Sequence, residues 1–163
     1  MKTIKHLENT YPEFQSTGNA ARFFIPFAKE VCKGEGYDIG CNREEWKFPD
    51  ATPIDLTLGS NALSLPPGRV DYIFSSHCLE HLPNWVTALE HWAEHIKSGG
   101  SLALYIPHED QSYWHPWHNR KHIHSFSSTL MRKYFAENAH LWAKAFVSER
   151  DLNHSIAIIA ERA

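Results

Sequence analysis

Some apolar positions form short runs that are typical of strands, and others recur every three to four residues, as in helices. The two patterns alternate along the chain, which predicts short strands that alternate with helices. Strands are expected over residues 37–39, 52–56, 62–65, 70–75, 101–106, 145–148 and 155–160. Helices are expected over residues 19–31, after Asn84 and after Ser127. The run 70–75 is almost continuously apolar, as in a strand that is covered on both faces. This alternation predicts one α/β domain with a mostly parallel sheet.

Single residues mark the expected ends of these helices. Asn84 and Ser127 are typical N-caps, and Gly99 is placed to end the helix that Asn84 begins. Pro26 lies inside the first helix and is expected to bend or restart it. Only about ten residues separate the first glycine turn from the second strand, too few for the usual crossover helix. A single turn through residues 43–46 is therefore expected there.

The polarity of the N-terminal segment suggests how the chain is divided. Residues 1–18 are polar and are expected to form a loose arm or a lid, ahead of a domain over 19–163. No apolar signal core and no stretch of membrane-spanning length occurs, so we expect a cytoplasmic protein without a membrane partner. Cys32, Cys41 and Cys78 form no CxxC pair, which fits a reducing compartment.

Composition narrows the class of ligand. The formal net charge is −3 with histidine neutral, so there is no general basic field to hold a nucleic-acid backbone. Six tryptophans, six tyrosines and nine phenylalanines allow a chain of 163 residues to bury much apolar surface. We therefore expect a small-molecule partner and no nucleic acid.

Three segments carry the candidate chemistry. Gly36-Tyr-Asp-Ile-Gly-Cys-Asn is typical of a strand that runs into a glycine turn, and Pro53-Ile-Asp-Leu of a strand end that carries an acid. The third segment is the apolar strand at 70–75, which opens into Ser75-Ser-His-Cys-Leu-Glu-His-Leu. A nucleotide-like ligand needs this order, because a bare turn permits backbone contact and a carboxylate can bind a ribose diol. A dehydrogenase turn needs two further glycines, which the residues after Gly40 lack.

Together these segments resemble the class I S-adenosylmethionine-dependent methyltransferases, and most closely the group whose fourth strand ends in Ser-Ser-His-x-Leu-Glu-His-Leu. The resemblance implies a single-domain, Rossmann-like sheet with a C-terminal antiparallel hairpin, here with a shortened first crossover. It implies S-adenosylmethionine as the cofactor. It also implies methyl transfer to an oxygen or nitrogen of a small molecule, such as a sugar or another metabolite.

The same resemblance assigns roles to individual residues. Asp55 would accept hydrogen bonds from both ribose hydroxyls, with Leu56 against the adenine. Asn42 stands where the family usually has glycine, and asparagine tolerates the positive φ of such a turn. Asn61 stands where the family usually has aspartate. The full set of implied cofactor-binding residues is Asp38, Gly40, Cys41, Asn42, Asp55, Leu56, Asn61, Ala62 and Ser76.

Two histidines are the candidate catalytic residues. His77 follows the strand at 70–75 and could orient the substrate or accept a proton; capping the next turn is the alternative role. His108 follows the next strand, where the family places substrate-binding residues, and an imidazole titrates near neutral pH. Glu80 and His81 are interpreted as packing or helix-start residues rather than catalytic ones.

Two other hypotheses stay open. The departures at Asn42 and Asn61 fit a protein that binds S-adenosylmethionine or S-adenosylhomocysteine without transferring a methyl group. A histidine-rich metal-binding module is the second, because His118, His122 and His124 could supply three imidazoles. The cysteines lie elsewhere and such spacings alone are weak evidence, so no metal is expected.

Overall fold

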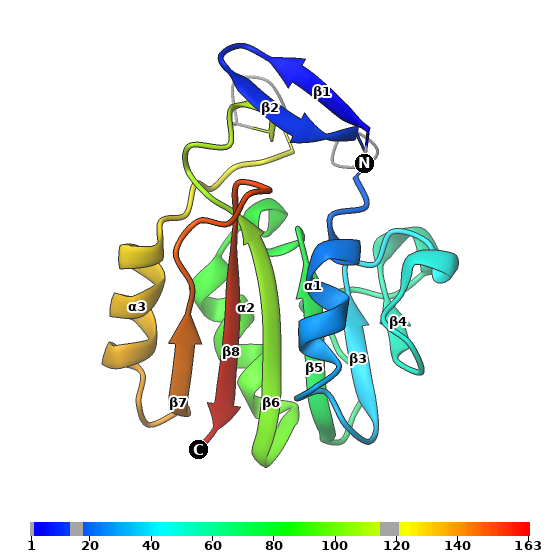
Figure 1. Ribbon diagram of the computed structural model, residues 1–163. Coiled ribbons are helices and arrows are strands. Elements are labelled where there is room, and N and C mark those ends of the chain that lie inside the picture. Colours follow the sequence, from blue (N-terminus) through cyan, green and yellow to red (C-terminus); the bar gives the residue numbers. More distant parts are fainter. Residues whose placement is uncertain (1, 14–17, 115–120) are drawn as a thin grey trace.

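The computed structural model describes residues 2–13, 18–114 and 121–163, and Figure 1 shows a sheet with helices on both faces and a separate hairpin at one end. The helices and strands are β1 (Thr3–His6), β2 (Asn9–Pro12), α1 (Ala21–Ala28), β3 (Gly36–Ile39), β4 (Thr52–Ile54), β5 (Val70–Ser76), α2 (Trp85–Glu94), β6 (Ile96–Pro107), α3 (Ser128–Glu137), β7 (Trp142–Val147) and β8 (Ser155–Arg162). No helix among these residues is long and apolar enough to cross a bilayer.

The larger sheet has six strands in the order β4-β3-β5-β6-β8-β7. Strands β4, β3, β5 and β6 are parallel, whereas β8 runs antiparallel between β6 and β7. This confirms the expected mostly parallel sheet with a C-terminal antiparallel hairpin. After β3 the chain moves to β4 on one side and then to β5 on the other, so the carboxyl ends of these strands enclose a crevice.

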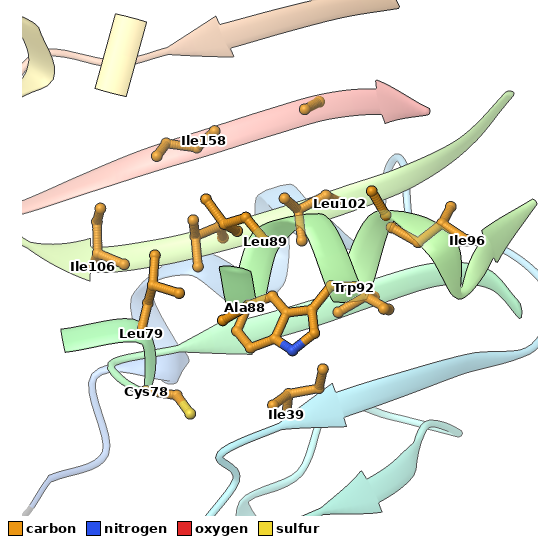
Figure 2. Packing of buried hydrophobic residues seen from close by; sticks show 14 of the residues in the cluster. Ile39, Cys78, Leu79, Ala88, Leu89, Trp92, Ile96, Leu102, Ile106 and Ile158 are labelled. Carbon is orange, nitrogen blue, oxygen red and sulfur yellow. The ribbon is translucent and has the colours of Figure 1, made fainter. Parts of the chain in front are cut away.

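Two apolar clusters hold the helices on opposite faces of the sheet. On one face Leu89 and Trp92 of α2 are fully buried over Leu102, as Figure 2 shows. On the other face Phe24 of α1 stacks on Tyr105, with ring centroids 5.2 Å apart. Burying a large side chain of this kind contributes roughly 1.5–3 kcal/mol. Helix α1 continues through Pro26 without restarting and ends two residues later.

Local capping agrees with the sequence. The side chain of Asn84 accepts hydrogen bonds from the amides of Val86 and Thr87, and Ser127 accepts one from the amide of Leu130. Each cap satisfies amide groups that the first turn of a helix leaves without a partner. Both predicted helix starts are therefore confirmed. The first crossover is also short, with one 3₁₀ turn at Glu44–Trp46.

The predicted end of α2 near Gly99 is wrong. The helix stops at Glu94, because Ile96 already pairs with Val70 in the sheet. The carbonyl of His95 also accepts a hydrogen bond from the amide of Val70 at 2.9 Å. Gly99 does adopt a left-handed φ of 75°, but it does so within β6 rather than at a helix end. Sheet pairing has overridden the local helical pattern.

The predicted strand at residues 62–65 is also wrong. This segment makes only an isolated bridge between Asn61 and Ser64. The side chain of Asn61 accepts a hydrogen bond from the amide of Leu63 at 2.8 Å, which folds the segment into a turn. The carbonyl of Ala62 accepts a hydrogen bond from the indole of Trp92, so this turn is fastened to α2.

The N-terminal segment differs from the loose arm that its polarity predicts. Strands β1 and β2 form an antiparallel hairpin, which lies beyond the carboxyl ends of the parallel strands in Figure 1. Tyr11 anchors it, since this side chain is fully buried and its ring lies 4.6 Å from that of His154. Its hydroxyl is 2.9 Å from the Oγ of Ser112. The division of the chain at residue 18 remains a prediction.

Candidate functional site

A pocket of about 620 Å³ opens where β3, β4 and β5 end. A place at the carboxyl ends of parallel strands, where the strand order reverses, is typical of ligand sites in such sheets. Its wall is made by Gly18, Ala20, Gly40, Asn42, Ile54, Asp55, Leu56, Thr57, Asn61, Ala62, Leu63, Ser76, His77, Cys78, His81, Leu82, Pro83, Trp114, Lys121 and His122.

The structure brings most of the predicted site residues to this pocket. The predicted residues that line it are Gly40, Asn42, Asp55, Leu56, Asn61, Ala62, Ser76 and His77. Asp38 and Cys41 line a small cavity that shares Gly40 and Ser76 with the pocket wall. His108 lines neither space.

The glycine turn after β3 has the backbone shape that the sequence predicts. Gly40 has a φ of 85° and Asn42 a φ of 62°, so both adopt the left-handed conformation. The amide of Gly40 donates to the carbonyl of Ile54 at 2.8 Å, and the amide of Asn42 donates to the carboxylate of Asp55 at 2.8 Å. These two bonds fix the turn against the end of β4.

Asp55 has a structural role that the sequence did not predict. Its Oδ2 accepts the bond from Asn42, and its Oδ1 accepts bonds from the amide and the hydroxyl of Thr57, both at 2.8 Å. A carboxylate offers about four acceptor positions, so acceptor capacity remains for a ligand diol. The side chain of Leu56 beside it is 78% exposed and that of Leu63 is 40% exposed. They form an apolar edge on which a flat ring can lie.

Two buried side-chain oxygens beside the pocket have no hydrogen-bond partner within the described chain. They are Oδ1 of Asp38 and Oγ of Ser76, and both residues line the small cavity. The other oxygen of Asp38 accepts a hydrogen bond from the amide of Phe48 at 2.6 Å, and burial raises the pKa of the carboxyl to about 7. An unsatisfied buried acceptor is costly, so a ligand that presents a donor or an ammonium group would suit this position.

His77 lies at the end of β5 in a conformation that is uncommon for a residue with a side chain, with a φ of 50°. Burial, together with the nearby His122 and His81, lowers the pKa of its imidazole to about 3. Its Nε2 is 3.1 Å from the Oγ of Ser155. The ring is therefore neutral at physiological pH and is a weak general base there, suited to orienting a ligand.

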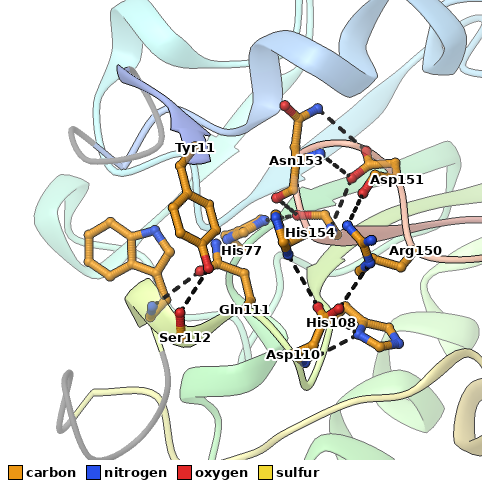
Figure 3. A network of polar contacts seen from close by, with 12 residues as sticks. Tyr11, His77, His108, Asp110, Gln111, Ser112, Arg150, Asp151, Asn153 and His154 are labelled. Carbon is orange, nitrogen blue, oxygen red and sulfur yellow. Dashed lines mark hydrogen bonds and ion pairs between the residues drawn. The ribbon is translucent and has the colours of Figure 1, made fainter. Parts of the chain in front are cut away.

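His108 lies in the polar network that Figure 3 shows, which His77 also joins through its contact with Ser155. Its Nδ1 is 2.9 Å from the carboxylate of Asp110, which also pairs with Arg150 at 2.9 Å and with His154 at 3.4 Å. His108 does not line the pocket that His77 lines. Its proposed catalytic role remains a prediction.

Sequence reasoning missed the cluster around Glu80. This side chain is fully buried, and its Oε1 lies 3.7 Å from Nδ1 of His77, 3.8 Å from Nε2 of His81 and 3.7 Å from Nε2 of His122. The available signal was the spacing His-x-x-Glu-His directly after a strand. Contact with His122 could not be read from the sequence, because it depends on the amide of Ile123 donating to the carbonyl of Glu80.

The histidine set considered from the sequence for a metal is not the one that comes together. His118 lies outside the described residues. The Nε2 of His124 is 2.8 Å from the carbonyl of Leu82 and donates to it. Within the described chain, the group whose ligand atoms lie within 4.8 Å of one another is Glu80, His81 and His122.

Comparison with known proteins adds to this geometry. Residues 16–139 match a family model described as a methyltransferase domain. No curated protein matches the chain. A putative methyltransferase from Haloferax volcanii, solved in complex with the Trm112 methyltransferase activator, is 13% identical with a TM-score of 0.66, over 91% of this chain and 93% of that one.

Other solved structures share the fold at similar identity. The N-methyltransferase NodS from Bradyrhizobium japonicum WM9, in complex with S-adenosyl-L-homocysteine, is 14% identical with a TM-score of 0.59, over 96% of this chain and 89% of that one. A possible histamine N-methyltransferase from Thermotoga maritima is 12% identical with a TM-score of 0.63, over 92% and 93% of the two chains. At these identities the likeness shows the fold alone.

Proposed function

Because the chain belongs to the class I S-adenosylmethionine-dependent methyltransferases, we propose that it methylates an oxygen or nitrogen atom of a small molecule, such as a sugar or a similar metabolite. The main support for the proposal is that the pocket wall differs between its two halves. Polar turn residues and exposed leucines follow β3 and β4, whereas imidazole and indole rings follow β5 and β6. One pocket thus offers room for two different ligands.

The β3–β4 side is the proposed cofactor site. Asp55 would accept from the ribose hydroxyls with its remaining lone pairs, and Leu56 would lie against the adenine. Asp38 and Ser76 would face the amino-acid end, where their unpartnered oxygens suit an ammonium group. Gly40 and Asn42 shape the turn between these two ends.

The β5–β6 side is the proposed acceptor site. Trp114 stacks on His122, with ring centroids 5.7 Å apart and ring planes 17° apart, which gives this wall a flat aromatic surface. His77 also lines this wall, and its imidazole is neutral at physiological pH. A net charge of −3 supports a small acceptor over a nucleic acid.

When bound, the cofactor supplies an electrophilic methyl group on a sulfonium sulfur. The residues of this chain would contribute alignment: they hold the acceptor's lone pair in line with the carbon–sulfur bond. The acceptor atom would take the methyl group in place of its proton, which would leave to water, and the bonding electrons would stay with the sulfur. No described residue has to gain a proton for this reaction to balance.

Calorimetric titration with S-adenosylmethionine and S-adenosylhomocysteine tests the cofactor half of the proposal. We expect micromolar dissociation constants for both. Release of S-adenosylhomocysteine in the presence of a panel of sugars and small amines or alcohols then tests transfer. Binding without turnover across the panel would favour a binding protein, and no heat at millimolar ligand would overturn the cofactor site.

A further inference from the structure

The carboxylate of Glu80 is buried in a shell of imidazole nitrogens rather than hydrogen-bond donors. Neither of its oxygens accepts a hydrogen bond from the described chain, although the side chain is fully buried. The three imidazole nitrogens that surround Oε1 lie 3.7 to 3.8 Å away. These distances are too long for hydrogen bonds, so among residues 2–13, 18–114 and 121–163 no hydrogen bond to the carboxylate compensates its burial.

The hydrogen bond on the far side of His81 decides which of its nitrogens faces Glu80 with a lone pair. Its Nδ1 is 2.7 Å from the carbonyl oxygen of Lys121, and a carbonyl can only accept, so Nδ1 carries the hydrogen. In the neutral imidazole, Nε2 of His81 then has a lone pair, and it lies 3.8 Å from Oε1 of Glu80.

The same argument applies to His77. The hydroxyl of Ser155 lies 3.3 Å from the carbonyl of Asn153 and donates to it, so it accepts from Nε2–H of His77. Nδ1 of the neutral His77 is then an acceptor, 3.7 Å from Oε1 of Glu80. Nδ1 of His77 and Nε2 of His81 are thus both hydrogen-bond acceptors that face the carboxylate of Glu80, which is itself an acceptor. A proton on Glu80 could form a hydrogen bond to only one of the two nitrogens.

A cation bound at Glu80 would relieve this conflict between acceptor atoms. We propose that Glu80, His81 and His122 bind a divalent first-row transition metal ion, with Zn²⁺, Co²⁺ and Ni²⁺ as the best candidates. Imidazole and carboxylate are the ligands that these ions prefer, and two histidines with one acidic residue form a known type of open metal site. Ligand atoms around a tetrahedral ion lie about 3.3–3.6 Å apart, so small shifts inward would suffice.

The surroundings already have the features of a supported metal site. A metal-binding histidine typically donates its other ring hydrogen to a carbonyl or carboxylate, as His81 does to Lys121. Trp114 stacks on His122 and restrains its ring. His81 and His122 also line the pocket while Glu80 lies behind them, so the ion would be reached from the pocket.

An ion held by three residues keeps a position for a further ligand, and this position would be open to the pocket. An acceptor oxygen or nitrogen could bind there. That role rests on the proposed function, whereas metal binding itself does not.

The test uses protein purified without a histidine tag, stripped with a chelator and titrated with Co²⁺ and then Zn²⁺. We expect one equivalent of Co²⁺ to bind with a visible d–d absorption band, and Zn²⁺ to displace it. His81→Gln and Glu80→Gln should each weaken binding by about 100-fold or more. Glutamine keeps the shape of Glu80, and His81 is partly exposed, so circular dichroism and urea midpoints can establish that both variants fold.

The matched control is His95→Asn. His91 lies in α2 and His95 directly follows it, and both are partly exposed. Their ring centroids are 4.5 Å apart, so the pair could bind metal adventitiously. Removing His95 should leave the Co²⁺ spectrum unchanged. Binding of less than about a tenth of an equivalent, or binding that His95→Asn removes and His81→Gln does not, would overturn the proposal.

S-adenosylhomocysteine titration of the same samples separates this inference from the proposed function. If the nucleoside binds and the metal does not, only the metal site is wrong. If the metal binds and the nucleoside does not, the proposed cofactor site is wrong and the metal site stands.

Discussion

Cys78 packs so closely on Gly40 that a methyl group at Gly40 would lie 2.4 Å from the Cβ of Cys78 and 2.6 Å from its Sγ. Contacts this short do not occur between real side chains, so only glycine fits at this position. The glycine turn after β3 and the polar loop after β5 are therefore one packed unit. The turn owes its glycine to this neighbour as well as to its positive φ.

Gly40→Ala should destabilise the protein more than Gly59→Ala does. Both glycines have a left-handed φ, 85° and 83°, which alone costs alanine about 1–2 kcal/mol. A Cβ at Gly59 meets nothing within 4 Å. The overlap with Cys78 should add about 1–3 kcal/mol in the Gly40 variant. Urea unfolding of the two variants measures the difference, and equal free energies of unfolding would show that the contact with Cys78 relaxes freely.

Asp55→Asn should weaken the affinity for S-adenosylhomocysteine by about tenfold or more, which corresponds to about 1.4 kcal/mol. The change removes the charge that a ribose diol would contact. Calorimetric titration measures the affinity. The control is Thr57→Val, which removes the hydroxyl that lies within hydrogen-bond distance of the carbonyl of Asn42 and of Oδ1 of Asp55, and leaves the carboxylate in place. If both variants lose affinity equally at similar stability, Asp55 acts by holding the turn rather than by contacting the ligand.

Asp38 should make the protein less stable as the pH rises toward neutrality. Burial raises the pKa of this carboxyl from 3.8 to about 7, so the folded chain binds the proton more tightly than the unfolded chain. Its contribution to stability is complete below pH 3.8 and is lost as the pH rises through about 7. Asp38→Asn should flatten this part of the curve of unfolding free energy against pH, as measured by urea titrations at successive pH values.

Asp71→Asn serves as the control for this pH dependence. A hydrogen bond from Lys97 lowers the pKa of Asp71, which is exposed, so its contribution is present above the ordinary pKa and is lost as the pH falls. Its removal should leave the slope between about pH 4 and pH 7 unchanged. An Asp38→Asn variant with the slope of the unmodified protein would contradict the assignment.

Tyr11→Ala should release the N-terminal hairpin from the rest of the fold. The variant loses a buried aromatic ring, which typically costs about 3–5 kcal/mol, and with it the contact to His154. Hydrogen exchange at the amides of residues 3–11 should become fast. Tyr11→Phe keeps the ring and loses only the hydrogen bond to Ser112, about 1 kcal/mol, so protection should persist. Fast exchange in both variants would mean that the hydroxyl, rather than the ring, holds the hairpin.

Much of the sheet and part of the pocket could be predicted from the sequence, because their signals are local. The caps at Asn84 and Ser127 act on amides within three residues, and the turn at Asn42 depends on a φ that asparagine tolerates. The apolar strand at 70–75 and the order of segments around it indicated where Asp55 would lie. These features depend on residues that are close together in the sequence, so a local sequence pattern is enough to predict them.

Other features were decided only by the tertiary structure. They are the places where contacts between segments distant in sequence override a local pattern or add to it. Pairing of Ile96 with Val70 ends α2 before its helical pattern ends. Burial of Tyr11 turns a polar N-terminal segment into a docked hairpin. Glu80 meets His122 only because the loop after β6 folds back onto the turn after β5. Each outcome depends on burial and on the spatial approach of remote residues, which no local sequence pattern encodes.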